Sequence, residues 1–144
     1  MSKIFVVGYD DSPSSRRAVD YVLAQAEEQK AGIVIAHVLE WSPYSFLTPE
    51  ELEERHQRRK EELSRAEAAV IQPLVDQIVQ KGIQVESELR YGNIADTLCE
   101  IAKEKNASQL VVGRTGDAGV VSRIFGSVAA ALAQSSPVPC TIIP

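Results

Sequence analysis

Residues 4–39, IFVVGYDDSPSSRRAVDYVLAQAEEQKAGIVIAHVL, contain the pattern that decides the fold. The runs 4–9 and 33–39 are short, apolar and nearly continuous, which is typical of strands buried on both faces. Between them, apolar residues recur at helical spacing. These residues are Ala18, Val19, Val22, Leu23 and Ala26. The stretch therefore predicts a strand, a helix and a second strand parallel to the first.

The same stretch contains start and stop signals for its helix. Ser12 followed by Pro13 is a pattern typical of an N-cap and a first helical residue. Gly32 is expected to end the helix after Lys30. We expect a well-bounded crossover helix between the two strands.

Three further apolar runs, at 83–89, 110–113 and 138–143, are predicted to be strands. Thr48, Pro49 and Glu51 predict the start of a long charged helix that Gly82 ends and that Pro73 kinks or splits.

Two later helices complete the alternation of strands and helices. Asn93 is expected to cap a helix whose apolar residues include Ile94, Leu98 and Ile101. The final helix is expected to open at Gly126 and Ser127 and to cover 128–134.

Alternating strands and helices predict a single doubly wound α/β domain over residues 1–144. We expect a five-stranded parallel sheet in the order 3-2-1-4-5, with helices on both faces. Ligands of such sheets bind outside the carboxyl ends of the strands, where the strand order reverses. Residues 8–12, 37–41 and 113–127 are expected to meet there.

Composition excludes several classes of function. The 144 residues carry a formal net charge of -5 with both signs interspersed, so no basic stripe is available to bind nucleic acid. We expect no signal peptide and no membrane insertion, because no apolar run approaches the length of a bilayer span. The two cysteines have no metal or redox spacing, which favours a reducing cytoplasm.

Glycines flank a connection that leaves a buried strand and enters the final helix. Gly113, Gly116 and Gly126 allow bare backbone to approach a ligand, and amides at a helix start attract anions. Ser127 could add a hydroxyl to the same phosphate. Glycine spacing alone is equally consistent with an ordinary turn.

The segment 113–132, GRTGDAGVVSRIFGSVAAAL, resembles the pattern of ATP-binding universal stress proteins: Gly-x-x-Gly, nine residues, then Gly and Ser or Thr. The resemblance extends to VVGYDDSPSSRRAVDYVLAQA (6–26), HVLEW (37–41), RYGNIADTLCEIAKE (90–104) and SSPVPCTIIP (135–144). Residues 42–80 carry little specific likeness.

This resemblance implies an ATP site, with Mg²⁺ as a further candidate ligand. It implies that Asp10 faces the nucleotide at a ribose or a metal ion, while Ser12 is better explained as a helix cap. It places Val38 at the adenine. It also implies phosphate contacts from the residues of the glycine segment, which are Gly113, Arg114, Gly116, Gly126, Ser127 and Val128.

The glycine segment departs from the family pattern at two positions. Arg114 stands where a small hydroxylated residue is frequent, and Thr115 replaces a frequent arginine. Arg114 and Arg123 are the cations available for a triphosphate, although either could be a solvated surface charge. Asp117 would repel phosphate oxygens unless a divalent cation lay between them.

The family resemblance implies a nucleotide-dependent regulatory protein that acts through a partner protein. One alternative is an enzyme that transfers an adenylyl group or slowly hydrolyses ATP, although no residue is a convincing base for the attacking water. A second alternative is an interaction module without nucleotide. The outer edge of the predicted strand 138–143 would be unpaired in a monomer, which predicts a homodimer formed by pairing two such edges. The alternative is that Pro139, which lacks an amide donor, protects this edge from pairing.

Overall fold

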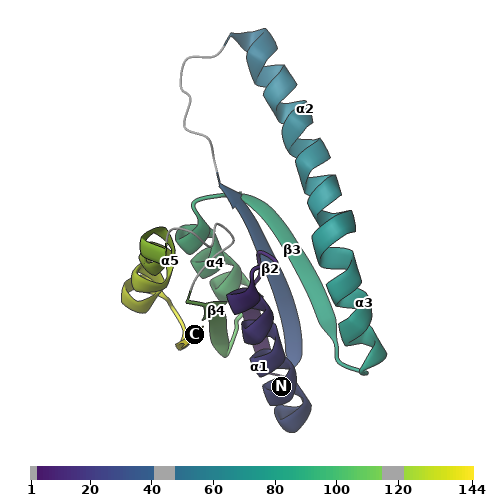
Figure 1. Ribbon diagram of the computed structural model, residues 1–144, viewed down its shortest axis with the longest axis vertical. Helices are drawn as coiled ribbons and strands as arrows, with labels where there is room; N and C mark the ends of the chain where they lie inside the picture. Colours follow the sequence, from purple (N-terminus) through teal and green to yellow (C-terminus); the bar gives the residue numbers. More distant parts are fainter. Residues whose placement is uncertain (1–2, 41–47, 115–121) are drawn as a thin grey trace.

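The computed structural model describes residues 3–40, 48–114 and 122–144. Five strands form one sheet in the order β3-β2-β1-β4-β5, and every neighbouring pair is parallel (Figure 1). The strands are β1 (Ile4–Gly8), β2 (Gly32–Glu40), β3 (Val85–Gly92), β4 (Gln109–Gly113) and β5 (Cys140–Ile143). The predicted strand order and direction are confirmed.

Helices cover both faces of this sheet, as predicted. They are α1 (Pro13–Gln29), α2 (Pro49–Ala66), the π-helical segment η1 (Glu67–Ile71), α3 (Gln72–Gln80), α4 (Ile94–Glu104) and α5 (Ser122–Ser135). Buried residues of α1, η1 and α3 form one apolar cluster with the sheet, and those of α4 and α5 form a second cluster. The doubly wound α/β class is therefore confirmed.

The two cores follow from alternation along the central strand. Phe5 and Val7 of β1 belong to the α1 and α3 side, whereas Val6 between them belongs to the α4 and α5 side. Successive side chains of a strand point to opposite faces, so a strand covered on both faces needs apolar residues throughout. The continuous apolar runs in the sequence have this cause.

Helix α1 begins as its sequence predicts but ends differently. The Ser12 side chain caps it, since its Oγ accepts a hydrogen bond from the Ser15 amide at 3.1 Å. At the other end Lys30 adopts the left-handed conformation, with φ at 55°, and Gly32 is already the first residue of β2. The prediction that Gly32 ends this helix was wrong, because Lys30 itself makes the left-handed turn.

The long charged helix is divided at Pro73, as predicted. Thr48 and Glu51 form a reciprocal capping box at the start of α2. The helix then passes through η1 into α3, which has Pro73 in its first turn. Proline lacks an amide proton and clashes with the preceding turn of an α-helix, and the wider π turn accommodates both.

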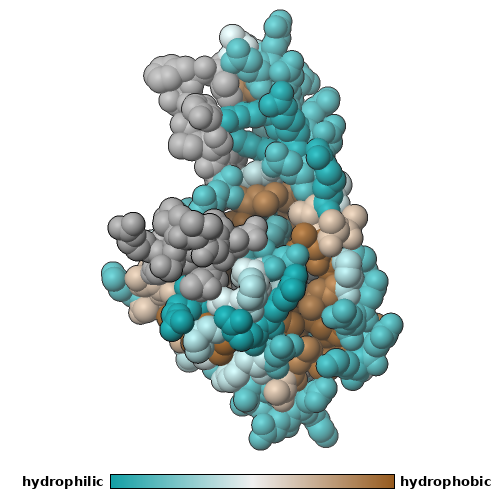
Figure 2. All heavy atoms as spheres, viewed as in Figure 1, coloured by the Kyte–Doolittle hydropathy of each residue, from teal (hydrophilic) through white to brown (hydrophobic). Residues whose placement is uncertain are grey.

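Helix α2 stands apart from the two cores. None of its residues is buried, and it extends beyond the sheet as an arm with a hydrophilic surface (Figures 1 and 2). In the same view apolar residues gather lower down, in the groove between α1 and α3 (Figure 2). In the part of the chain that the structure describes, no helix combines the length and apolarity needed to cross a membrane.

Helix α5 begins at Ser122, earlier than predicted. Gly126 and Ser127 consequently lie inside the helix rather than at its start. Only the first four amides of a helix lack an intrahelical partner, and Gly126 is the fifth residue. The apolar spacing of Ile124, Val128 and Leu132 continues the helical pattern toward the N-terminus, and this repeat outweighs the glycine as a boundary signal.

Two outer strands are also displaced from their predicted ranges. β3 runs from Val85 to Gly92 instead of covering 83–89, because it pairs with β2 as far as Glu40 opposite Gly92. β5 starts at Cys140 rather than at residue 138. Pro139 precedes the strand and contributes only its carbonyl, which accepts a hydrogen bond from the Leu110 amide at 2.9 Å.

Candidate functional site: a crevice at the carboxyl ends of the strands

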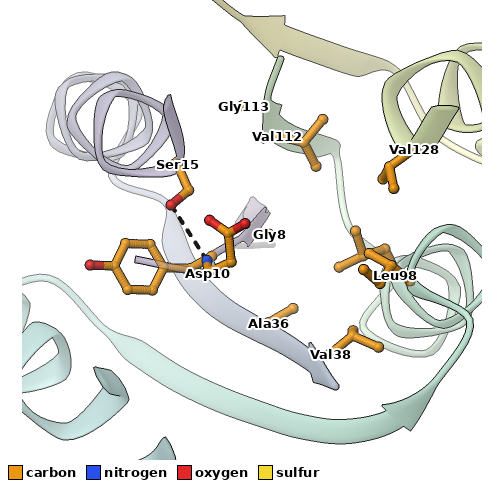
Figure 3. A pocket seen from close by; sticks show the side chains of 11 residues that line it. Gly8, Asp10, Ser15, Ala36, Val38, Leu98, Val112, Gly113 and Val128 are labelled. Carbon is orange, nitrogen blue, oxygen red and sulfur yellow. Dashed lines mark hydrogen bonds between the residues drawn. The ribbon is translucent and has the colours of Figure 1, made fainter. Parts of the chain in front are cut away.

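A pocket opens where β1, β2 and β4 end, on the side of the sheet covered by α4 and α5. The sheet changes winding direction between β1 and β4, where such folds bind ligands. The pocket is lined by Gly8, Tyr9, Asp10, Ser15, Ala36, Val38, Ile94, Leu98, Val112, Gly113 and Val128. Figure 3 shows that the carboxylate of Asp10 points into this hollow, opposite the apolar side chains.

Asp10 is held in place by the start of α1. Its carboxylate Oδ1 accepts a hydrogen bond from the Ser12 amide at 3.0 Å. Its own amide donates to Ser15 Oγ at 3.4 Å, which is the dashed contact in Figure 3. The predicted site residue Asp10 therefore lies in the pocket with a defined orientation and a second carboxylate oxygen available to a ligand.

The residue before Asp10 is anchored to β2. The Tyr9 amide donates to the Ala36 carbonyl at 2.9 Å, and the Tyr9 carbonyl lies 2.7 Å from His37 Nδ1. Because a carbonyl only accepts, His37 carries its proton on Nδ1 and donates it. His37 is thus a buried structural donor, in line with its interpretation as a strand-end histidine.

The residue after Asp10 makes an unusual turn. Asp11 has a φ of 63°, and its Oδ1 accepts hydrogen bonds from Arg16 at 2.7 and 3.1 Å and from the Tyr9 hydroxyl at 2.9 Å. The bonds from Arg16 and then from Tyr9 hold the pKa of the Asp11 carboxyl below its ordinary value. Burial, together with the bond to Asp11, raises the pKa of Tyr9. We call these three residues the Tyr9–Asp11–Arg16 clamp.

Gly113 lies in the pocket wall at the end of β4, and its glycine identity has a packing reason. A Cβ at this position would lie 2.7 Å from the Ser14 carbonyl carbon and 2.8 Å from its Cβ. Ser14 Oγ in turn lies 3.2 Å from the Ile143 carbonyl, which also accepts from the Arg114 amide at 2.6 Å. β4, β5 and α1 therefore meet at Gly113 without room for a side chain.

The other predicted site residues divide into three groups. Val38 and Val128 line the pocket. Arg114 is exposed directly after the end of β4, whereas Gly126 and the exposed Ser127 lie within α5. Gly116 lies outside the described residues, as do Thr115 and Asp117, and the side chain of Arg123 is likewise not described.

Val38 and Val128 were placed at the site from the sequence, but the other apolar residues of the pocket were missed. These are Ala36 from β2, Val112 from β4, and Ile94 and Leu98 from α4. Period-two alternation could have found the strand residues, because Ala36 and Val38 necessarily point to the same face. The helix residues carried no signal beyond ordinary core periodicity.

Neither histidine belongs to a metal-binding group. Among residues 3–40, 48–114 and 122–144, no three histidine, cysteine, aspartate or glutamate side chains gather as ligands for an ion. Asp10 alone presents a carboxylate to the pocket within this described part of the chain. A divalent cation here would need ligands from a bound molecule or water to complete its shell.

The sheet order and the crevice at its switch point define a doubly wound α/β protein with a pocket at the carboxyl edge, where such folds bind ligands. The whole chain, residues 1–144, matches the Universal stress protein family, and the protein belongs to that family. The chain is 28% identical over 151 residues to Universal stress protein YxiE of Bacillus subtilis, with 96% of each protein covered.

Solved structures share the fold. The universal stress protein UspA from Lactobacillus plantarum superposes with a TM-score of 0.82 at 21% identity, over 99% of this chain and 97% of that one. A universal stress protein in complex with cAMP superposes with a TM-score of 0.63 at 29% identity, over 99% and 96% of the two chains.

Proposed function

We propose that this protein binds ATP in the crevice between β1, β2 and β4, and that it acts in the cytoplasm as a nucleotide-dependent regulator of a partner protein. One observation carries the proposal: a single pocket joins apolar walls to an oriented carboxylate at the winding switch of the sheet. The family member in complex with cAMP supports an adenine nucleotide as the ligand class.

The apolar side of the pocket suits a purine base. Ala36, Val38 and Leu98 line one part of it, where a flat aromatic ring can be removed from water. Val38 also lies at the end of β2, so its backbone can contact the edge of the base. We propose that adenine occupies this side.

The polar side suits the sugar and phosphates. Asp10 can accept hydrogen bonds from ribose hydroxyls or bind a magnesium ion that the phosphates complete. Gly113, the first residue of the glycine segment, lines the pocket. Arg114 and Gly116 follow it closely in the sequence, and we propose that they contact the phosphates. Gly126, Ser127 and Val128 would contribute through the side of α5 rather than through free amides at its start.

The proposed outcome of binding is regulatory. Nucleotide occupancy would favour one arrangement of the connection after Arg114, and a partner protein would bind that arrangement. Among the described pocket residues Asp10 alone has a carboxylate, and we assign it to the ribose or a magnesium ion rather than to an attacking water, so we expect ATP hydrolysis to be slow.

We further propose a homodimer formed through β5. This strand pairs only with β4 in the sheet order, and Ile142 on it is 36% exposed. Antiparallel pairing of two such edges gives a twofold interface. Light scattering at micromolar concentration should report twice the chain mass, and a monomeric mass would contradict the proposal.

The nucleotide proposal is tested on freshly purified protein. Mass spectrometry of the released small molecules should find an adenine nucleotide, and calorimetry of stripped protein should measure micromolar binding of ATP in the presence of Mg²⁺. ADP and AMP titrations identify which phosphates contribute. If no adenine nucleotide is carried and none binds, the interaction module without nucleotide becomes the better description.

Variants then locate the site. Asp10→Ala should weaken ATP binding by about tenfold, since a charged hydrogen bond or a metal ligand is lost. Asp20→Ala is the matched control, because Asp20 is an exposed aspartate of α1 outside the pocket. Equal affinities of the Asp10 variant and the control would place the nucleotide elsewhere.

A further inference from the structure

Asp11 occupies a backbone conformation that is unfavourable for a residue with a side chain. Its φ of 63° lies in the left-handed region, where the Cβ of an L-residue crowds its neighbours. Aspartate tolerates this conformation better than most residues, but a compensating interaction is still expected. The position directly follows Asp10, which carries the proposed ligand contact.

The compensation comes from the Tyr9–Asp11–Arg16 clamp. A single carboxylate oxygen of Asp11 accepts from two nitrogens of Arg16, at 2.7 and 3.1 Å, and from the hydroxyl of Tyr9 at 2.9 Å. Tyr9 is itself buried and tied to β2 through its amide and its carbonyl. The clamp therefore connects Asp11 to the sheet on one side and to α1 on the other.

The backbone of Asp11 also decides where Asp10 points. The amide of Ser12 belongs to the peptide that follows Asp11, and it donates to Asp10 Oδ1 at 3.0 Å. Because φ and ψ of Asp11 orient that peptide relative to Asp10, leaving the left-handed region would remove this hydrogen bond. The Asp10 carboxylate would then lose the group that aims it into the pocket.

We propose that Tyr9, Asp11 and Arg16 are positioning residues for nucleotide binding, which they support by holding the turn that aims Asp10. The inference rests on the proposed nucleotide-binding function. Asp11 and Arg16 are not part of the pocket lining and act through Asp10, whereas Tyr9 holds Asp11 and also lines the pocket.

The first test compares three variants of Asp11 by calorimetric titration with ATP and Mg²⁺. Asp11→Ala keeps the Cβ and loses the clamp, so its affinity should fall by about tenfold. Asp11→Gly loses the clamp but adopts positive φ without strain, so its loss should be smaller. Asp11→Asn tolerates positive φ and can still accept from Tyr9 and Arg16, so it should restore most of the affinity.

A purely structural role for Asp11 predicts a different pattern. It would lower the melting temperature of Asp11→Ala while leaving the ATP affinity of the folded fraction equal to that of the unmodified protein. That result would overturn the inference, as would equal affinities of the asparagine and alanine variants.

A double-mutant cycle tests whether Asp11 acts through Asp10. In an Asp10→Ala background the further change Asp11→Ala should cost less than about twofold, because the carboxylate to be aimed is already absent. Losses of affinity that multiply independently would show that Asp11 does not act through Asp10.

A ligand-free measurement separates this inference from the proposed function. In amide NMR spectra, the signals of Asp10 and Ser12 should shift in Asp11→Ala and return toward their original positions in Asp11→Asn. If these signals shift but the unmodified protein binds no adenine nucleotide, the turn is held as described and the proposed function fails. If they do not shift, the positioning role is wrong.

Discussion

The ends of the neighbouring strands β1 and β4 both line the pocket, but different interactions hold each of them in place. At the end of β1, side chains hold the turn: Ser12, Ser15 and the clamp supply hydrogen bonds around Asp10. At the end of β4, Gly113 packs directly against the backbone and side chain of Ser14, and the absence of a side chain is the essential feature. The comparison teaches that a strand end can be fixed by polar contacts or by close approach, and the two should respond differently to substitution.

The largest expected effect is at β4. Gly113→Ala would place a methyl group within 2.8 Å of two atoms of Ser14 other than its flexible hydroxyl, so helix or strand must move. We expect the free energy of unfolding to fall by about 2 kcal/mol in urea denaturation, as for an overpacked core.

Gly32→Ala is the matched control, since the nearest atom to its added Cβ would lie 3.8 Å away. Replacing Ser14 by glycine in the Gly113→Ala background should recover part of the loss, because two of the three closest atoms disappear. If Gly113→Ala were no worse than Gly32→Ala, packing would not explain this glycine.

An intermediate effect is expected at the cap of α1. Ser12→Ala removes the hydroxyl that accepts from the Ser15 amide and should cost about 1 kcal/mol in the same denaturation experiment. Asn93→Ala removes the equivalent cap of α4, whose side chain accepts from the Asp96 amide at 3.0 Å, and should cost a similar amount.

These two cap variants differ in their distance from Asp10. Only Ser12 belongs to the turn that orients Asp10, so only its variant should also weaken ATP binding. Equal ATP affinities of the two variants would mean that the Ser12 cap of α1 stabilises the fold but does not affect ligand binding at the end of β1.

The smallest effect is the pH dependence of the clamp. The pKa of the Asp11 carboxyl is lower in the folded protein than in the unfolded chain. The clamp therefore contributes its full stabilisation of the folded state at pH values above the pKa of this carboxyl in the unfolded chain. This contribution is lost as the pH falls through the lower, folded pKa.

The melting temperatures of the unmodified protein and of Arg16→Gln should therefore differ slightly at neutral pH and converge in acid. Both side chains are largely exposed, so added salt should also reduce the difference. A difference that grew on acidification would contradict the assignment of Asp11 as the acceptor.

The sequence predicted what depends on repeating patterns. Apolar runs located the strands, and the hydroxyl caps at Ser12 and Thr48 located two helix starts, because such caps act within a few residues. The meeting of residues 8–12 and 37–41 at one edge followed from the sheet order, since parallel strands end at one edge. The choice of Asp10 and Val38 within these ranges came from the family resemblance.

Features that depend on long-range packing escaped prediction. The start of α5 was misplaced because Gly126 was interpreted as a helix boundary, whereas the helix continues through it to Ser122 despite the cost of an interior glycine. The left-handed turns at Asp11 and Lys30 occur at residues other than glycine, where the sequence carries no strong signal. Position 113 requires glycine because Ser14 packs against it. Ser14 lies about a hundred residues earlier in the chain, so no local sequence pattern reveals this contact.

The π-helical segment η1 has a consequence for the direction of the helix faces. One residue more or less in a helix rotates everything after it by about 100°. Upstream of η1, helix α2 has no buried residue, whereas Ile71 at the end of η1 and Ile78 in α3 are fully inside the core. The segment thus sets the direction in which the side chains of α3 face. Deleting one residue from it would turn the apolar face of α3 away from the sheet while leaving α2 unchanged.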